Sequence, residues 1–396
     1  DAFLELWHGP TCAFKDMALQ IMPKLLSLSI EKQGGGKDAL ILVATSGDTG
    51  KAALEGYRDV ERVRILVFYP TGGVSRIQQK QMATQAGNNV GVIAIRGNFD
   101  DAQTAVKRVF GSPEMAAEAD RHGFFFSSAN SINWGRLAPQ IVYYVSAYCD
   151  LLHAGRIQPG EPVNICVPTG NFGNILAAYI AKRMGLPVDK LICASNRNHI
   201  LTDFFETGVY DRNRAFYTTI SPSMDILISS NLERLLYFAA GPETTKGWMA
   251  LLAETGRFAI GETLRRTLAA DFTACYLDED ETRATIRSLY REYGYLCDPH
   301  TAVAAGALRK YRQASGDGRV TVVASTASGY KFAPAVCEAL GIGQDGDAYA
   351  CIDALKNETG LPVPPQLAGL QGLPDRFTKV IEREEIADAV RAFMSE

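Results

Sequence analysis

The sequence predicts an α/β protein in which parallel sheets are covered by helices. Short apolar runs of strand length alternate with segments of helical character along most of the chain. Polar turns follow several of these runs directly. A strand that is buried on both faces is apolar throughout, and a helix that connects two such strands makes them parallel. The length of 396 residues fits one large or two ordinary domains.

The expected elements follow from these runs in chain order. In the first part, strands are expected at residues 39–44, 64–69, 89–95 and 124–127, with helices from about residue 51 and at 77–85 and 101–110. Further along, a long amphipathic helix is expected at 134–152, strands at 163–167, 191–195 and 319–324, and helices at 175–184 and 332–340. Residues 201–296 are expected to be mostly helical. Parallel sheets bind ligands at the carboxyl ends of their strands, so the polar turns there form the candidate site.

The composition excludes several classes of protein. Hydrophobic residues make up 47% and charged residues 21%, which is ordinary for a globular protein, and no apolar run approaches the length of a membrane span. The net charge of -4 and the lack of a Lys/Arg block argue against a nucleic-acid partner. The eight cysteines include no C-x-x-C pair, so no metal site is expected, and they favour reduced, buried thiols in a cytoplasmic enzyme.

The first candidate residue is Lys15, in the stretch His-Gly-Pro-Thr-Cys-Ala-Phe-Lys-Asp at residues 8–16. If the fold withdraws this lysine from water, the neutral amine is favoured and can form a Schiff base. Because most lysines are solvated, the local sequence alone favours the alternative, a surface lysine at the start of a helix.

Two turns join a strand to a helix and offer backbone N–H groups to an anion. Residues 45–50, Thr-Ser-Gly-Asp-Thr-Gly, supply hydroxyls at a helix N-terminus, where a carboxylate or phosphate binds well. The alternative there is a capping turn in which Ser46 or Asp48 caps the helix. Residues 170–174, Gly-Asn-Phe-Gly-Asn, predict a phosphate cradle but match neither the dinucleotide fingerprint nor Walker A, so NAD and ATP are poorly supported.

Two other turns offer polar side chains. Residues 128–136 hold Arg136 and several Asn and Ser, and they could bind a second anion, with a capped helix and a surface arginine as the alternative. Residues 325–331 supply neutral hydroxyls, and a plain turn is favoured there from the local sequence. Asp298 and His300 have no further metal ligands nearby, so His300 is interpreted as a hydrogen-bonded structural or supporting group.

Together these clusters resemble the threonine synthase family. The stretch around Lys15 is similar to the cofactor-lysine motif of that family, and the clusters at 46–50, 130–136, 170–174, 298–301 and 325–332 follow in the same order. The resemblance covers residues 5 to 340 approximately, and the motifs are specific in combination. The His-Gly-Pro-Thr lead-in and Asp48 resemble the longer bacterial and fungal branch, which carries an additional N-terminal region. Because the chain starts at Asp1 rather than Met, we expect such a segment to be missing here.

The resemblance implies a two-lobed, fold-type II pyridoxal 5′-phosphate enzyme that is similar to the tryptophan synthase β chain. The family converts O-phospho-L-homoserine and water to L-threonine and phosphate by β,γ-elimination and replacement. We expect a smaller α/β lobe at residues 38–150, and a larger cofactor-binding lobe formed by residues 1–37 and 151–396. The oligomeric state, monomer or dimer, stays open.

The same resemblance implies the roles of individual residues. Lys15 is the catalytic residue and carries the cofactor as a Schiff base. The other cofactor contacts implied are Asp48 at the 3′-oxygen, the phosphate-binding turn Gly170, Asn171, Phe172, Gly173 and Asn174, and Thr326 opposite the pyridine nitrogen. The substrate contacts implied are Thr45, Ser46 and Thr49 for the carboxylate, and Asn130, Ser131 and Arg136 for the phosphate.

Other functions remain as alternatives. A serine/threonine dehydratase of the same fold would not need the anion site at residues 130–136. A phospho-lyase that releases 2-oxobutyrate would bind the same substrate, so the sequence does not separate it from the synthase. A non-catalytic cofactor-binding regulator is disfavoured because Lys15 and the substrate anion site are both retained. A dehydrogenase is disfavoured because the dinucleotide fingerprint is absent.

Overall fold

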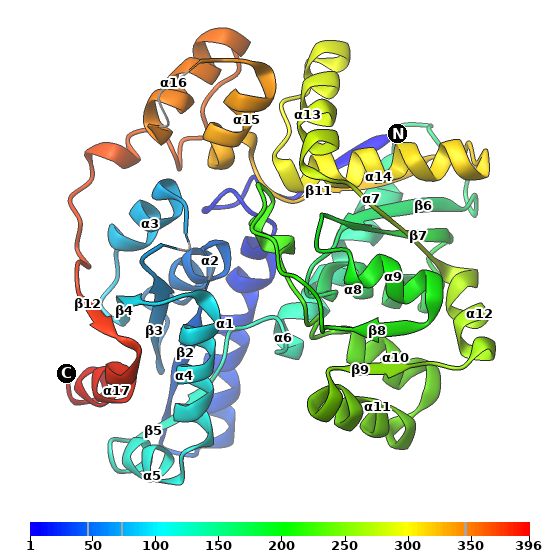
Figure 1. Ribbon diagram of the computed structural model, residues 1–396. Helices are drawn as coiled ribbons and strands as arrows, with labels where there is room; N and C mark the ends of the chain where they lie inside the picture. The colour runs from blue at the N-terminus through cyan, green and yellow to red at the C-terminus, as the bar shows by residue number, and fades with distance from the viewer. Residues whose placement is uncertain (46, 73, 344–346) are drawn as a thin grey trace. The chain divides into compact units, whose positions relative to one another are not determined.

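The computed structural model describes residues 1–45, 47–72, 74–343 and 347–396, and the chain divides into two compact units (Figure 1). Residues 7–136 and 346–396 form one unit, which we call the lysine unit. Residues 1–6 and 137–345 form the other, which we call the turn unit. These bounds differ from the lobes expected from the sequence. The segments 7–37 and 346–396 fold with the smaller unit, because α1 packs against α2 and strand β12 pairs with β4.

The lysine unit is built on a five-stranded parallel sheet in the order β12-β4-β3-β2-β5. Its strands are β2 (Asp38–Ala44), β3 (Val63–Pro70), β4 (Val90–Arg96), β5 (Phe124–Ser127) and β12 (Val380–Glu382). Its helices are α1 (Lys15–Gln33), α2 (Asp48–Tyr57), α3 (Arg76–Ala83), α4 (Phe99–Gly111), α5 (Pro113–Arg121), α16 (Ala348–Thr359) and α17 (Ile386–Ser395). The short helix α6 (Trp134–Leu137) ends the first part of this unit.

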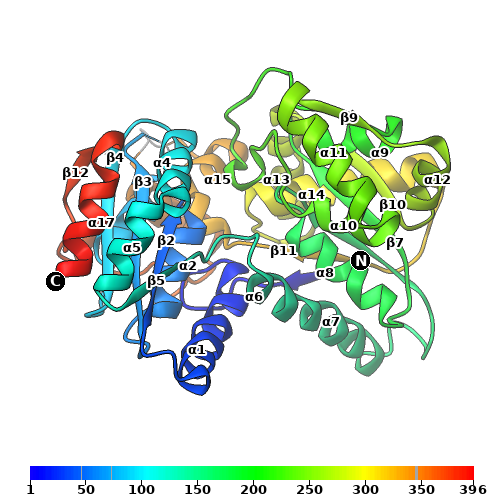
Figure 2. The same cartoon turned by 90° about the horizontal axis from the view of Figure 1, so that it is seen from below.

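Helices cover both faces of this sheet. On one face, Leu19 of α1 and Leu54 of α2 pack with the buried side chains Ile41 and Val43 of β2. On the other face, α4, α5 and α17 pack against Leu40 and Leu42 of the same strand. Figure 2 shows α1 and α4 on opposite sides of β2 and β3. Alternate side chains of β2 therefore pack into two different apolar cores, which explains why every residue after Asp38 in this strand is buried.

The turn unit holds a second five-stranded parallel sheet, in the order β1-β11-β6-β7-β10. Its strands are β1 (Ala2–Glu5), β6 (Val163–Pro168), β7 (Val188–Ser195), β10 (Phe272–Tyr276) and β11 (Thr321–Ser325), and β8 (Val209–Asp211) pairs with β9 (Arg257–Ala259) in a separate antiparallel ribbon. The helices are α7 (Ile141–His153), α8 (Gly173–Arg183), α9 (Ile200–Thr207), α10 (Leu232–Ala240), α11 (Pro242–Thr255), α12 (Glu262–Asp271), α13 (Glu279–Tyr293), α14 (Pro299–Ser315) and α15 (Ala333–Leu340).

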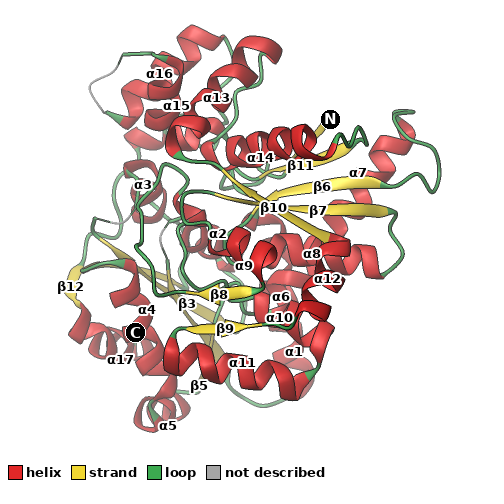
Figure 3. Cartoon of the chain, turned by 45° about the vertical axis from the view of Figure 1, so that its right-hand side comes forward, coloured by secondary structure: helices red, strands yellow, loops and turns green. Residues whose placement is uncertain are grey.

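One face of this second sheet is packed against α14. Val303, Ala304 and Ala307 of α14 join buried residues of β6, β7 and β11 in a single apolar cluster. Helix α8 contacts β6 and β7, and Figure 3 shows α8 and α14 on opposite sides of these strands. At their carboxyl ends, β6 and β11 lead into the turns at residues 169–173 and 326–328.

The structure confirms the predicted α/β class, the parallel sheets and the strands expected in both parts of the chain. The single helix expected at 134–152 is wrong, because a 3-10 turn at Ala138–Gln140 separates α6 from α7. Pro139 lies in this turn and has no N–H to continue the helical ladder. The mostly helical region also contains strands β8, β9 and β10, which the sequence analysis did not find. In the described part of the chain, every helix is too short or too polar to cross a membrane.

Candidate active site

Lys15 is the first residue of α1, and the fold withdraws its side chain from water. The side chain is 11% exposed, and its Nζ atom lies 3.7 Å from Oδ2 of Asp48, whose side chain is 4% exposed. The ammonium group also lies 5.0 Å from the centre of the Phe14 ring. The surface lysine favoured by the local sequence is therefore wrong, because tertiary packing, which the local sequence does not contain, buries this residue.

The turn before Lys15 is held by Asp16, which is 1% exposed. Its carboxylate accepts hydrogen bonds from the N–H of Thr11 at 2.8 Å and from the Thr11 hydroxyl. A Cβ atom added to Gly9 would lie 2.6 Å from Oδ2 of Asp16, so the turn fits closely around this carboxylate. Asp16 thus fixes the direction in which the chain enters α1 and positions Lys15.

Asp48 is fixed by the tight turn that starts α2. Gly47 has a φ of 136°, in the region that favours glycine, and a Cβ atom there would overlap the amide of Gln78. Without that atom, Gln78 Nε2 donates to Asp48 Oδ1 at 2.9 Å. The other oxygen of Asp48 faces Lys15, so the carboxylate is shared between an amide donor and an amine.

The predicted carboxylate-binding residues lie in the same turn. The hydroxyl oxygen of Thr45 accepts hydrogen bonds from the N–H groups of Gly47 at 3.0 Å and of Gly50 at 2.9 Å. Thr49 is half-buried in the first turn of α2. Ser46 lies outside the described residues. Thr45 therefore shapes the turn, and its hydroxyl proton has no acceptor within the described residues.

The predicted phosphate-binding residues form a second turn of the lysine unit. Asn130 donates through Nδ2 to the carbonyl oxygen of Ala44 at 3.3 Å, which joins this turn to the end of β2. Arg136 is 3% exposed and donates through Nη1 to the carbonyl oxygen of Ala129 at 2.6 Å. The surface arginine considered as an alternative is therefore wrong. Burial raises the pKa of the Tyr57 phenol, and the positive charge of Arg136 opposes part of this shift.

The predicted phosphate cradle, residues 170–174, lies in the turn unit and is called here the anion turn. It follows β6, and Phe172 has a φ of 64°, a left-handed conformation that is uncommon for a residue with a side chain. No side chain caps α8, and the N–H groups of residues 171–174 have no acceptor in the part of the chain that the structure describes. Free N–H groups at a helix N-terminus attract an anion.

The side chain of Asn174 adds a further donor to the anion turn. Its Oδ1 atom accepts a hydrogen bond from the hydroxyl of Tyr144. Its Nδ2 atom is buried and has no hydrogen-bond partner within the described residues. A buried amide donor without a partner is costly, so a bound acceptor is expected beside it. The donor set of this turn fits a phosphate group.

Thr326 follows β11 in the turn unit and is 6% exposed. Its N–H donates to the hydroxyl oxygen of Thr301 at 3.3 Å. The neighbouring Ser325 hydroxyl lies within hydrogen-bond distance of the hydroxyl oxygens of Tyr295, at 2.9 Å, and of Thr301, at 3.2 Å. The Thr326 backbone is therefore held by α14, and its side chain carries no charge.

The sequence analysis did not find several residues that hold these groups. Gln78 could have been found, because Ser75-Arg76-Ile77-Gln78 has the spacing of a capping box, and the structure contains that box. Tyr144 lies in a predicted helix, but nothing in the sequence pairs it with Asn174. Ser229 and Asn231, which bond the anion turn, lie in a segment with no periodic pattern.

Comparisons with known proteins identify the family of this chain. The family model "Pyridoxal-phosphate dependent enzyme" matches residues 4–326, and the model "Threonine synthase, C-terminal" matches residues 301–394. The human protein named threonine synthase-like 1 is 45% identical over 86% of this chain, but the chain spans only 46% of that protein. The threonine synthase of Pseudomonas aeruginosa is 42% identical, over 93% of this chain and 76% of the relative.

A solved structure, the pyridoxal-phosphate-bound threonine synthase of Brucella melitensis, matches with a TM-score of 0.84 and 38% identity. The match covers 99% of this chain and 78% of that one. The fold is therefore that of the fold-type II enzymes, and pyridoxal phosphate is the cofactor. The chain belongs to the threonine synthase family of pyridoxal-phosphate dependent enzymes.

Proposed function

We propose that this protein converts O-phospho-L-homoserine and water to L-threonine and phosphate. The observation that carries the proposal is the amine of Lys15, which is buried 3.7 Å from Asp48 in the unit that also holds Asn130 and Arg136. An amine that is withdrawn from water suits covalent attachment of an aldehyde cofactor. The carboxylate beside it suits proton transfer, because it stabilises the protonated amine. Membership of the threonine synthase family supports the choice of substrate.

Lys15 is proposed to hold the cofactor covalently and to act as the general base. Pyridoxal phosphate, when bound, withdraws electrons from the carbon atoms of the substrate and so makes their protons removable. The Lys15 amine accepts and returns these protons. Asp48 stabilises the ammonium form of Lys15, and Gln78 keeps the carboxylate in place through the hydrogen bond of 2.9 Å. This arrangement allows one lysine to serve successive proton transfers.

The cofactor phosphate is proposed to bind the anion turn. The N–H groups of residues 171–174 and the Nδ2 atom of Asn174 are the donors. Gly170 allows the turn to pack closely against its neighbours, since a Cβ atom at this position would lie 2.6 Å from the carbonyl oxygen of Ser223. Thr326 is proposed to face the pyridine nitrogen. Because a hydroxyl is neutral, it would not stabilise a full positive charge on that nitrogen as an aspartate would.

The substrate is proposed to be held through its two anionic groups in the lysine unit. Thr45 and Thr49, with Ser46, would take the carboxylate, and the hydroxyl proton of Thr45 is suited to donate to it. Asn130, Ser131 and Arg136 would take the phosphate. The bond from Arg136 to the Ala129 carbonyl uses one of five guanidinium N–H groups and fixes the orientation of the plane. Arg136 would then stabilise the phosphate as it leaves.

Product analysis tests the proposal. The protein is loaded with pyridoxal phosphate and incubated with O-phospho-L-homoserine, and amino acids, 2-oxo acids and phosphate are measured. Threonine and phosphate in equal amounts are expected. Phosphate with 2-oxobutyrate would instead establish the phospho-lyase, and turnover of serine or threonine without any turnover of the phosphorylated substrate would establish the dehydratase. Absence of every product would contradict the catalytic assignment.

A further inference from the structure

A path of hydrogen bonds in the turn unit starts at Asp298, the residue before α14. Its side chain is fully buried. The carboxylate accepts hydrogen bonds from the N–H of His300 at 3.0 Å, from the N–H of Thr301 at 3.2 Å and from the Thr301 hydroxyl. Its Oδ2 atom also lies 2.5 Å from Nδ1 of His300. Asp298 therefore fixes both the first turn of α14 and the orientation of the His300 ring.

The other ring nitrogen of His300 identifies the tautomer. The backbone nitrogen of Ser223 lies 3.1 Å from Nε2 of His300. A backbone N–H can only donate, so Nε2 is the acceptor and carries no proton. The ring proton is therefore on Nδ1, where Asp298 accepts it. A neutral imidazole, with one donor and one acceptor, thus joins the start of α14 to Ser223.

The segment that contains this serine, residues 221–231, is called here the anchored segment, and it bonds directly to the anion turn. The hydroxyl of Ser229 donates to the carbonyl oxygen of Gly170 at 2.7 Å. Asn231 donates to the carbonyl oxygen of Asn171 twice, through Nδ2 at 2.9 Å and through its N–H at 3.1 Å. Two successive carbonyl groups of the turn are therefore held by one segment.

These contacts set the direction of the N–H groups in the turn. The described peptide bonds are trans, and a trans peptide directs its N–H opposite to its carbonyl group. Because the carbonyl groups of Gly170 and Asn171 face the anchored segment, the N–H groups of Asn171 and Phe172 face away from it. The fit is close, since a Cβ atom added to Gly170 would lie 2.6 Å from the carbonyl oxygen of Ser223.

We propose that His300 is a positioning residue for the cofactor phosphate. By holding Ser223, His300 keeps the anchored segment against the anion turn and so keeps the N–H groups of the turn in a binding orientation. This inference rests on the phosphate role proposed above for residues 170–174. The inference gives the Asp298–His300 pair a role in cofactor affinity, although neither residue needs to touch the cofactor.

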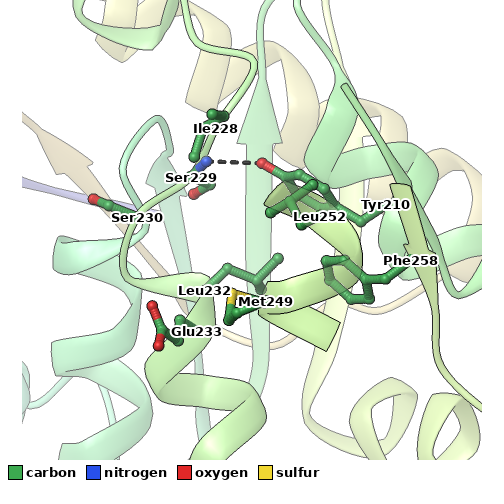
Figure 4. A pocket seen from close by; sticks show the side chains of 9 residues that line it. All are labelled: Tyr210, Ile228, Ser229, Ser230, Leu232, Glu233, Met249, Leu252 and Phe258. Carbon is green, nitrogen blue, oxygen red and sulfur yellow. Dashed lines mark hydrogen bonds between the residues drawn. The ribbon is translucent and has the colours of Figure 1, made fainter. Parts of the chain in front are cut away.

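Other contacts hold the anchored segment independently of His300. Oδ1 of Asp225 accepts hydrogen bonds from Nδ2 of Asn196 at 2.8 Å and of Asn198 at 2.9 Å. At the far end, the hydroxyl of Tyr210 accepts a hydrogen bond from the N–H of Ser229 at 2.7 Å, beside a pocket of about 60 Å³ lined mainly by apolar side chains (Figure 4). Loss of the His300 contact should therefore displace the segment locally while the unit stays folded.

Two variants of His300 separate the proposed role from a purely structural one. In His300→Asn, the shorter amide can still donate to Asp298 but no longer reaches Ser223. In His300→Gln, the longer amide places an oxygen near the position of Nε2 and can still accept the Ser223 N–H. If His300 only supported α14, the protein would tolerate His300→Asn better than His300→Gln. The proposed role predicts the opposite order.

The readout is the dissociation constant of the apoprotein for pyridoxal 5′-phosphate and for pyridoxal, which lacks the phosphate. Loss of one hydrogen bond corresponds to about fivefold. We expect His300→Asn to bind pyridoxal 5′-phosphate about fivefold or more weakly and to bind pyridoxal like the parent protein. We expect His300→Gln to stay within about twofold of the parent for both ligands. Any of three results overturns the proposal. His300→Asn binds both ligands like the parent protein, His300→Asn loses affinity for both ligands equally, or His300→Gln binds pyridoxal 5′-phosphate as weakly as His300→Asn does.

Two further variants complete the experiment. Asp317→Ala removes hydrogen bonds to Asn164 and Tyr311 just beyond the C-terminal end of α14, at the opposite end of this helix from His300, and controls for a general loss of stability. It should leave the ratio of the two dissociation constants unchanged. Asn174→Ala removes a donor from the turn itself. If it changes the ratio and His300→Asn does not, the positioning role of His300 is refuted, whereas the anion turn keeps its assignment as the phosphate site. If neither changes it, the assignment of the turn fails as well.

Discussion

Lys15 and Asp48 form a buried ion pair, with Nζ and Oδ2 separated by 3.7 Å and both side chains almost excluded from water. The two residues start different helices, α1 and α2, so the pair depends on the packing of these helices against each other. A buried carboxylate stabilises the charged amine, and it is itself costly to bury unless it is hydrogen-bonded. Gln78 provides that hydrogen bond.

Replacing Asp48 by asparagine should lower kcat by about 10- to 100-fold, since the amine loses the charge that stabilises its protonated form while the side chain keeps its size. The dissociation constant of the cofactor should change less than kcat. Steady-state kinetics and cofactor titration measure both quantities. Glu55→Gln is the matched control, because Glu55 lies on the same helix and pairs with Lys51 at 3.2 Å. An Asp48→Asn enzyme with the parent kcat would remove Asp48 from the mechanism.

Replacing Arg136 by alanine should raise KM for O-phospho-L-homoserine by about tenfold or more, because a charge-assisted bond to phosphate is lost. Binding of pyridoxal phosphate should change much less. Arg136 also bonds the Ala129 carbonyl, so Arg136→Lys is needed as a milder change. The exposed Arg108 supplies the control Arg108→Ala. Equal losses of substrate and cofactor affinity in the Arg136 variants would show that the residue does not hold the substrate phosphate.

Replacing Gly47 by alanine should destabilise the protein by about 1 to 3 kcal/mol, because alanine is strained at a φ of 136°. The added methyl group would also overlap the Gln78 amide and displace it from Asp48. Urea unfolding gives the free energy, and kcat should fall with it. Gly35→Ala is the control, because a Cβ atom there meets nothing within 4 Å. A Gly47→Ala protein as stable as the Gly35→Ala protein would contradict the tight turn described here for the start of α2.

The cysteines should differ sharply in their reaction with alkylating reagents. Cys149 is exposed, whereas Cys166, Cys193 and Cys297 are buried. Burial raises the pKa of the Cys193 thiol to about 12 and raises those of Cys166 and Cys297 well above their usual range. Because the thiolate is the reactive form, the three buried thiols should stay unmodified at pH 8 and at pH 9, whereas the exposed Cys149 should react.

Mass mapping after brief treatment with iodoacetamide checks this expectation. The same treatment in denaturant should label all eight cysteines. Rapid native labelling of Cys193 at pH 8 would show that the sheet carrying β7 opens more readily than its burial indicates.

The sequence predicts the central strands of both sheets because they are largely apolar, whereas the short strands β1, β8, β9, β10 and β12 were not predicted. Strand β2 shows this, since its residues face two cores and none of them after Asp38 is polar. Strand β10 was missed because Phe272–Tyr276 is short, lies at the edge of its sheet and is flanked by helices. The break at Pro139 could have been predicted from the residue type alone.

The candidate site was predictable only in part. The glycine positions of the anion turn follow from local sequence, but the burial of Lys15 and Arg136 follows from tertiary packing. The link from His300 to Ser223 joins residues 77 positions apart through a ring nitrogen and a backbone N–H. Since any residue except proline supplies that N–H, no residue pattern could have identified the partner.

The assignment of Lys15 as the reacting amine supports every other role in the site, and one measurement tests it directly. The protein loaded with pyridoxal phosphate is reduced with borohydride, digested, and mapped for the peptide that carries the pyridoxyl group. The account predicts the label on Lys15 and no label in Lys15→Ala. The label on another lysine, such as the fully buried Lys331, would contradict the account, even if the parent protein makes threonine.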